Sequence, residues 1–289
     1  MIRLLSSLIL LLTTITLLAQ APVFGESNSG PIRDASVLLL KASHEQQRLI
    51  DPVTYAIGRM TLDDAYTVQD RLCRDRKEPV IGYKLAFASS AAQRRWNIDA
   101  PVSGRLFASG RVPEGGTLEA ASFRKFMIEA EIAFIVAGDI RAPVTSVDAL
   151  REQTASVHLA LDIIDMPFSS ENAPPTVEDI VCANAAASHV MLGEPMPASK
   201  AVALSGIHIR MSHDGKDVYM GDSRAVMDDP WNAYLWLSRH LIQRGTPLKK
   251  GDIVLSGAVA AAYSGSAGRI QGDYVATAGA LGELLFTLK

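Results

Sequence analysis

The stretch Met127–Val136 reads MIEAEIAFIV and decides the fold. Its side chains alternate with period two, which is typical of a β-strand. One face of that strand would carry only apolar side chains. The opposite face is apolar as well, except for the neighbouring carboxylates of Glu129 and Glu131. The stretch therefore predicts a core strand that presents a pair of acids.

Two carboxylates side by side repel each other, and burying a charge is costly unless a counter-charge or hydrogen bonds compensate it. Glu129 and Glu131 therefore call for a cation, supplied by an arginine, a lysine or a bound metal. Carboxylate oxygens are hard ligands that suit magnesium, manganese or calcium. The alternative is that this face is solvated and the pair is a surface acid doublet.

A third acid interrupts the next predicted strand, Val157–Ile164. Asp162 lies on its otherwise apolar face and is the natural companion of the glutamate pair. His158 shares that face, where a satisfied core or rim histidine is the simpler interpretation. Asp165, just beyond the strand, is a ligand or a turn residue, and the turn is favoured because Met166 and Pro167 follow.

The N-terminus has the form of a secretory signal. Arg3 precedes the apolar segment Leu4–Leu18, and Ala19-Gln20-Ala21 resembles a signal-peptidase site. We expect residues 1–21 to be a signal peptide and the mature protein to be exported, periplasmic or secreted. No other stretch approaches the ~20 apolar residues of a membrane span, so we expect no membrane association after cleavage. The alternative is an uncleaved amphipathic anchor.

Composition indicates an ordinary globular enzyme. The chain has a net charge of −3, 20% charged residues and 48% hydrophobic residues, and nothing in it suggests binding to nucleic acid. Two cysteines are too few for a disulfide scaffold or a thiolate metal site. Export would permit a bridge between Cys73 and Cys182, but two separately buried thiols are an equal alternative.

The sequence pattern changes at Pro79, from helical spacing of apolar residues to short β-like runs. Before it, a polar linker and two predicted helices, Ile32–Ile50 and one capped by Thr61 and reaching about Arg76, form an N-terminal helical arm spanning residues 22–78. After it, β-like runs such as Val80–Ala88 and Leu106–Val112 alternate with glycine and proline through residues 79–289.

Two later signals are strong. Asp214-Gly215 predicts a hairpin between Ile207–Met211 and Val218–Gly221. Asp229-Pro230 predicts the start of a helix over Trp231–Arg244.

An ordered set of short motifs resembles the 2-oxo-4-pentenoate hydratase branch of the fumarylacetoacetate hydrolase superfamily, over about residues 61–289. The motifs are GYKLAFAS at Gly82–Ser89, PVSGRLF at Pro101–Phe107, IEAEI at Ile128–Ile132, ALD at Ala160–Asp162, Asn184, and GDIVLSGA at Gly251–Ala258.

The resemblance implies an α+β fold, a fumarylacetoacetate hydrolase-like mixed β-roll with peripheral helices, which here follows the helical arm. It also implies homo-oligomeric assembly and a divalent metal, Mg²⁺ or Mn²⁺, held by Glu129, Glu131 and Asp162. Such hydratases usually have glutamate at the third position; aspartate is one methylene shorter, so the metal would sit nearer that strand or be reached through water.

The implied function is that of a lyase of the hydratase type acting on a 2-oxo or 2-hydroxydienoic acid through a metal-stabilised enolate. Lys84 would anchor a carboxylate or pass a proton, unless it is a surface lysine whose stem covers the roll. Ser89, Asn184 and Ser256 are candidate hydrogen-bond donors to the substrate, but each could equally serve a turn or a backbone group.

Two departures from the family pattern weaken the resemblance in its chemistry. Hydratases often carry an acid where Val102 stands and a serine where Ala186 stands. Two alternatives therefore stay open: decarboxylation of a 2-oxo diacid through the same enolate, and a non-catalytic exported protein that binds a 2-oxo acid.

Overall fold

The computed structural model describes residues 29–201, 203–266 and 268–289. The predicted signal peptide, residues 1–21, lies outside the described residues. Within the described part, no helix combines the length and apolar character needed to cross a bilayer.

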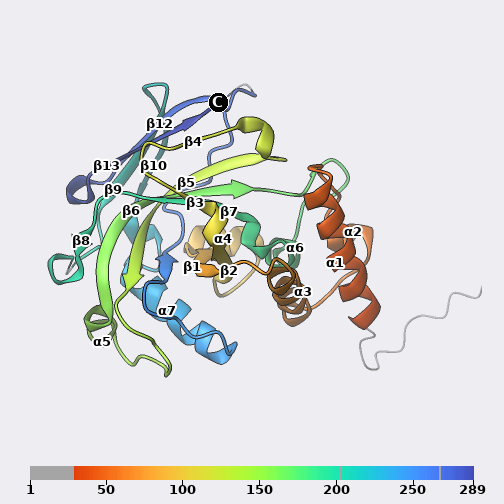
Figure 1. Ribbon diagram of the computed structural model, residues 1–289, viewed down its shortest axis with the longest axis horizontal. Helices are drawn as coiled ribbons and strands as arrows, with labels where there is room; N and C mark the ends of the chain where they lie inside the picture. The colour runs from red at the N-terminus through yellow and green to blue at the C-terminus, as the bar shows by residue number, and fades with distance from the viewer. Residues whose placement is uncertain (1–28, 202, 267) are drawn as a thin grey trace, which may run out of the picture.

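Two mixed sheets form the body of the protein (Figure 1). The strands of the larger sheet, in spatial order, are β2 (Val102–Phe107), β1 (Val80–Ala86), β11 (Ile253–Leu255), β5 (Phe126–Val136), β6 (Thr154–Asp165), β7 (Ala187–Leu192) and β3 (Arg111–Val112), with β8 (Met196–Pro197) paired to β6. In this sheet β1 pairs with β11 in parallel, as β3 does with β7, and the other pairs are antiparallel. The smaller sheet runs β10 (Lys216–Asp222), β9 (His208–His213), β12 (Gly272–Thr277), β13 (Glu283–Leu288) and β4 (Thr117–Leu118).

The apolar face of β5 builds the main core, as its alternation predicts. The five side chains of that face are at most 1% exposed and pack against the smaller sheet and against α7 (Pro230–Gln243). Phe134 lies 4.6 Å from the ring of Trp231 and 4.8 Å from that of Tyr234. Each fully buried side chain of this size contributes about 1.5–3 kcal/mol, so this face fixes the register of the sheet.

The opposite face of the large sheet lines the inside of a curl. Leu106 from β2 and Val190 from β7 share one buried cluster with Ala133 and Leu255, although β2 and β7 are far apart in the strand order. The sheet therefore rolls over this face, which also carries the acids. The predicted α+β fold with a mixed β-roll is confirmed.

Four helices lie together on one side of the roll. In Figure 1, α1 (Ser29–Glu45), α2 (Val53–Ala56) and α3 (Leu62–Asp75) lie to the right of the sheets, with α6 (Val177–Cys182) between. Thr61 caps α3 in a capping box with Asp64, as predicted. The first helix ends five residues earlier than predicted because the chain turns at Gln47, with φ +48°, and Ile50 then bridges to Phe168. The division into arm and roll at residue 78 stays a prediction.

Short elements account for the other differences. The predicted strand Leu106–Val112 is interrupted by a 3₁₀ turn, Ala108–Gly110. Pattern reasoning missed α4 (Ser90–Trp96) because seven residues carry little periodicity. Asp214 and Gly215, with φ of +50° and +75°, make the predicted hairpin turn, and α5 spans Val147–Glu152.

Cys73 and Cys182 are both free and buried, so the alternative of separate thiols is the right one.

Gly82 is the position in β1 where only glycine fits. Its φ is +154°, and a Cβ there would come within 2.0 Å of the Ile253 carbonyl oxygen on β11. We predict that Gly82→Ala lowers the free energy of unfolding by about 3 kcal/mol or more, as measured by urea denaturation. Gly138→Ala is the control, since its Cβ would meet nothing within 4 Å. Equal stabilities for the two variants would contradict this assignment.

Candidate metal centre and active site

Strand pairing brings the three acids to one point. Glu129 on β5 stands directly opposite Asp162 on β6, and Glu131 stands opposite Ala160 one step along the same face. Directly opposed residues in an antiparallel pair have neighbouring side chains. One carboxylate oxygen from each of the three acids lies within 4.8 Å of the others. The structure therefore brings the predicted ligand set together.

Lys84 joins the acids from the other side of the curl. Its strand, β1, is separated from β5 by β11, and its Nζ forms an ion pair with Asp162 Oδ2. Lys84 is 1% exposed, and Glu131 and Asp162 are fully buried. Glu129 keeps a partly exposed surface. The alternative of a surface lysine is therefore wrong, and Glu129 marks the accessible side of the cluster.

Burial controls the protonation of this cluster. Desolvation raises the pKa of Glu129 to about 7, against the opposing charge of Lys84. Desolvation, with the charges of Asp162 and Glu129, raises the pKa of Glu131 well above its usual range. Burial raises the pKa of Asp162 despite the Lys84 charge. Burial would lower the pKa of Lys84, but the three acids outweigh it and raise that pKa.

The hydrogen bonding of the acids leaves oxygens available for a ligand. The Gly257 backbone N–H donates to Glu131 Oε2 at 2.6 Å. Glu131 Oε1 and Asp162 Oδ1 are buried and have no hydrogen-bond partner among the described residues, which is uncommon for buried polar atoms. With all groups ionised, three carboxylates and one ammonium carry two negative charges. A divalent cation with oxygen preference fits both the charge and these unpartnered oxygens.

The predicted substrate contacts are engaged in local structure. Ser89 Oγ accepts a hydrogen bond from Ala92 N at 3.1 Å and so caps α4. Asn184 accepts from Arg105 N at 2.7 Å and donates to Arg105 O at 2.8 Å. Ser256 is buried at the end of β11, with its hydroxyl 3.5 Å from Gly257 O. Their role in substrate binding stays a prediction.

A strained turn lies beside Lys84. Asn184, Ala185 and Ala186 have φ of +57°, +52° and +52°, a left-handed conformation that costs each alanine roughly 1–2 kcal/mol. A Cβ at Gly104 would come within 2.4 Å of Asn184 O, and Gly104 pairs with Lys84 across β1 and β2. The turn therefore packs on β2 beside the Lys84 position of β1, and the Asn184 side chain holds it to the Arg105 backbone.

Two neighbouring residues have structural partners. His158 contacts Gly193 O through Nδ1 at 2.7 Å and Ser156 Oγ through Nε2 at 2.8 Å, as expected of a satisfied core histidine. Asp165 ends β6 and pairs with Arg124 at 2.8 Å. It does not belong to the group of acids that could share a metal.

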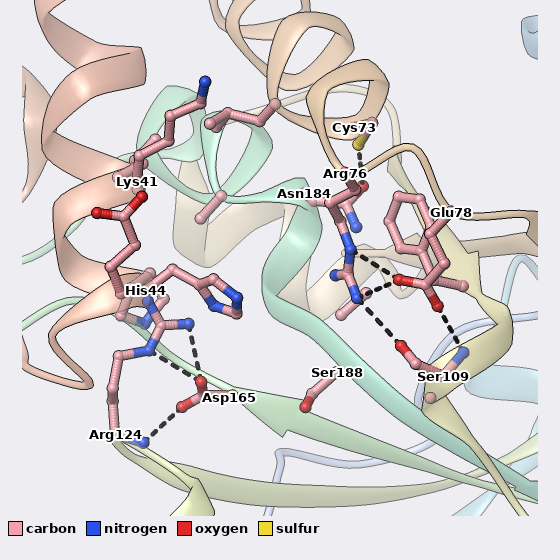
Figure 2. Close-up of a pocket in the computed structure, with 18 of the residues that line it drawn as sticks. Lys41, His44, Cys73, Arg76, Glu78, Ser109, Arg124, Asp165, Asn184 and Ser188 are labelled. Atoms are coloured by element: carbon pink, nitrogen blue, oxygen red, sulfur yellow. Dashed lines mark hydrogen bonds and ion pairs between the residues drawn. The ribbon is translucent and has the colours of Figure 1, made fainter.

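A second feature, a cavity of about 690 Å³, lies between α1, α3 and the first residues of β7 (Figure 2). Figure 2 shows Arg124 facing Asp165 on one wall and Arg76 facing Glu78 and Ser109 on the other. Neither Lys84 nor any of the three acids lines it. We place the chemistry at the acids, because there the unpartnered oxygens and the uncompensated charge coincide.

Sequence reasoning missed the amide of Gly257. The motif Ser256-Gly257-Ala258 drew attention to the serine hydroxyl, yet the backbone N–H of the next residue contacts Glu131. A positive φ of +102° and a Cβ position 2.5 Å from Ala88 require glycine here. A glycine directly after a strand was the only available signal.

Two hydratases resemble the chain in sequence. It is 30% identical over 225 residues to a 2-keto-4-pentenoate hydratase of Burkholderia vietnamiensis. This match covers 76% of this chain and 84% of that protein. It is also 30% identical over 230 residues to 2-keto-4-pentenoate hydratase 1 of Dechloromonas aromatica. This match covers 78% of this chain and 86% of that protein.

Solved structures share the fold at lower identity. The 4-oxalocrotonate decarboxylase of Pseudomonas putida G7, complexed with magnesium and adipate, superposes with a TM-score of 0.80 at 22% identity over 90% of this chain and 97% of that one. A fumarylpyruvate hydrolase of Pseudomonas aeruginosa in complex with Mn²⁺ and pyruvate has a TM-score of 0.54 at 17% identity over 73% and 90%.

The family model of the fumarylacetoacetate (FAA) hydrolase C-terminal domain matches residues 80–288, which is most of the chain and spans both sheets. The resemblance seen in the short motifs is thus confirmed: the chain belongs to the fumarylacetoacetate hydrolase family.

Proposed function

We propose that the protein is a divalent-metal-dependent lyase of the hydratase type that acts on a 2-oxo or 2-hydroxydienoic acid. The observation that carries the proposal is the convergence of Glu129, Glu131 and Asp162 on one point beside Lys84. The hydratases that are about 30% identical over three quarters of the chain support the reaction class. Neighbouring structures with magnesium, calcium or Mn²⁺ support a divalent ion; we propose Mg²⁺ or Mn²⁺.

The residues divide the chemistry between them. A divalent cation bound by the three acids would supply Lewis-acid polarisation of a 2-oxo group. Lys84 stays protonated beside Asp162, so its Nζ can hold a substrate carboxylate or deliver a proton to a carbon or oxygen atom of the substrate. The aliphatic inside of the roll behind the acids excludes water and strengthens these charge interactions.

A 2-oxo diacid decarboxylase is the second candidate, and the TM-score of 0.80 to the Pseudomonas putida decarboxylase is the observation that favours it. Val102 and Ala186, at 1% and 3% exposure, provide neither the acid nor the hydroxyl that hydratases often carry at these positions. A hydratase assay that follows loss of the dienoate chromophore, run beside a carbon dioxide assay, separates the two reactions. Tight binding of oxalate or pyruvate with Mg²⁺ and no product would indicate a binding protein.

Replacing one ligand tests the centre. We predict that Glu131→Gln abolishes both metal binding and turnover, because an amide oxygen cannot supply the negative charge that the cation requires. Calorimetric titration with Mg²⁺ and the chromophore assay measure the two effects. Glu152→Gln, at an exposed site on α5, is the matched control and should behave as wild type. Full turnover in Glu131→Gln, or in metal-stripped protein, would refute the proposed function.

The raised acid pKa values make stability depend on pH and metal. Between its ordinary pKa of 4.5 and its folded value of about 7, Glu129 holds a proton in the folded state that the unfolded state has lost. That contribution to stability is present at low pH and is lost as pH rises through 7. Histidines with lowered pKa, such as His240 at about 4, act in the opposite direction but below pH ~6.5.

We therefore predict that metal-free protein loses about 1 kcal/mol or more of stability between pH ~6.5 and pH ~8.5. Excess Mg²⁺ should restore more stability at the higher pH, because ligand carboxylates must ionise to bind it. Denaturant titrations with chelator and with Mg²⁺ provide the measurement. A metal-free stability that is flat or rises over this interval would count against the buried acid cluster.

Export and assembly are further proposals. The signal-like segment ending at Ala21 supports cleavage there and an exported, periplasmic or secreted enzyme. Homo-oligomeric assembly, which the resemblance in the short motifs implies, is proposed with it. We predict that the protein recovered from its native host starts at Pro22, as read by mass spectrometry of the intact chain. Recovery of a chain that starts at Met1 would contradict this.

A further inference from the structure

Tyr219 lies where the smaller sheet touches the strand that carries the glutamates. It belongs to β10, is 4% exposed, and its hydroxyl donates to the Ala130 carbonyl at 3.1 Å. Ala130 stands between Glu129 and Glu131 in the chain. The same hydroxyl accepts hydrogen bonds from Val259 N and Ala260 N, both at 3.1 Å. Its one donor and two acceptor positions are all used.

The hydroxyl fills a gap in the sheet. The chain after β11 pairs with β5 at Ser256, whose N–H donates to Ile132 O at 3.0 Å, and again at Tyr263, which exchanges two backbone hydrogen bonds with Ile128. Between these points the chain leaves β5, so no strand in the described part of the chain pairs with the Ala130 carbonyl on that side. The Tyr219 hydroxyl donates the hydrogen bond that a neighbouring strand would otherwise give to this carbonyl. It also binds the segment that departs from β5, residues 257–260, through Val259 N and Ala260 N.

The departing segment is the one that contacts the metal centre. Gly257 directs its N–H to Glu131 Oε2 at 2.6 Å, and it lies two residues before Val259. The position of that amide therefore depends on where Val259 and Ala260 are held. β10 approaches the segment a second time at Gly221, where an added Cβ would lie 2.6 Å from Val259 O.

We propose that Tyr219 is a positioning residue for the carboxylate centre: through Ala130 and the Gly257–Ala260 segment it fixes Glu131 in the orientation that binds the cation. This inference rests on the proposed function. It assigns to the smaller sheet, which contributes none of the acids, a role in metal affinity. Groups that orient metal ligands typically change affinity by about 10–100-fold when they are removed.

The test compares Tyr219→Phe with Tyr274→Phe. Tyr274 is a buried tyrosine in the same sheet whose hydroxyl donates to Ile270 O, away from the acids. Each metal-free variant is titrated with Mn²⁺ by calorimetry well below its Tm, and backbone hydrogen exchange of residues 257–262 is measured in the same samples. We expect Tyr219→Phe to weaken Mn²⁺ binding by about 10–100-fold and to speed exchange in the segment, and Tyr274→Phe to keep affinity within about twofold.

Gly221→Ala provides a second variant if Tyr219→Phe folds poorly. It keeps the hydroxyl but pushes the Val259 carbonyl from the same strand, so it should also weaken Mn²⁺ binding, by about tenfold. Affinities within about twofold of wild type in both variants, with lower stability alone, would overturn the inference and leave Tyr219 as a structural residue. Absence of Mn²⁺ binding in the wild-type protein would instead refute the proposed function, and exchange in the metal-free samples would still report whether Tyr219 holds the segment.

Discussion

The structure depends on keeping three acids and one lysine together inside a curled sheet. Glu131, Asp162 and Lys84 have almost no contact with solvent. Their internal compensation comes from the ion pair between Lys84 and Asp162 and from the Gly257 N–H donated to Glu131. Buried charge without a partner is among the most destabilising features that a protein can contain. The fold therefore tolerates this cluster only by raising acid pKa values or by accepting a cation, and the second route couples stability to function.

The rest of the fold can be understood as support for that cluster. The apolar face of β5 anchors the strand against α7 and the smaller sheet, and this fixes which side chains face the inside of the roll. Gly82 allows β1 to approach β11, and the pairing of the two strands carries Lys84 to the acids. On β2, next to Lys84, the left-handed turn at Asn184 packs over Gly104. The contacts at Gly82 and Gly104 are close backbone approaches, which explains why glycine occupies both positions.

Much of this arrangement could be predicted from the sequence. The alternation in Met127–Val136 was sufficient to place Glu129 and Glu131 on one face of the strand, and the same argument placed Asp162 on the next strand; whether that face is buried was left open. Strong local signals, such as the Thr61 capping box, the Asp214-Gly215 turn and the Asp229-Pro230 helix start, also correspond to the structure. These features are local, because they depend on side-chain period or on a few adjacent residues.

The parts that could not be predicted are those set by contacts between distant segments. The Gly257 amide, the Tyr219 hydroxyl and the pairing of Lys84 with Asp162 depend on how β1, β10 and β11 meet β5 and β6, and no local pattern encodes them. Ser89 and Asn184 show the converse. The family resemblance made them candidate substrate donors, with a turn or backbone role as the alternative. The structure shows that local role, a helix cap and a backbone clamp, and their contact with substrate stays a prediction.

The most direct measurement of the central claim is a crystal structure of the protein grown with Mn²⁺, with anomalous diffraction collected at the manganese absorption edge. The account predicts one strong anomalous peak bonded to carboxylate oxygens of Glu129, Glu131 and Asp162, at the ~2.0–2.2 Å separations usual for such hard oxygen ligands. A well-ordered centre with no peak between these acids, or with manganese bound only elsewhere, would contradict it.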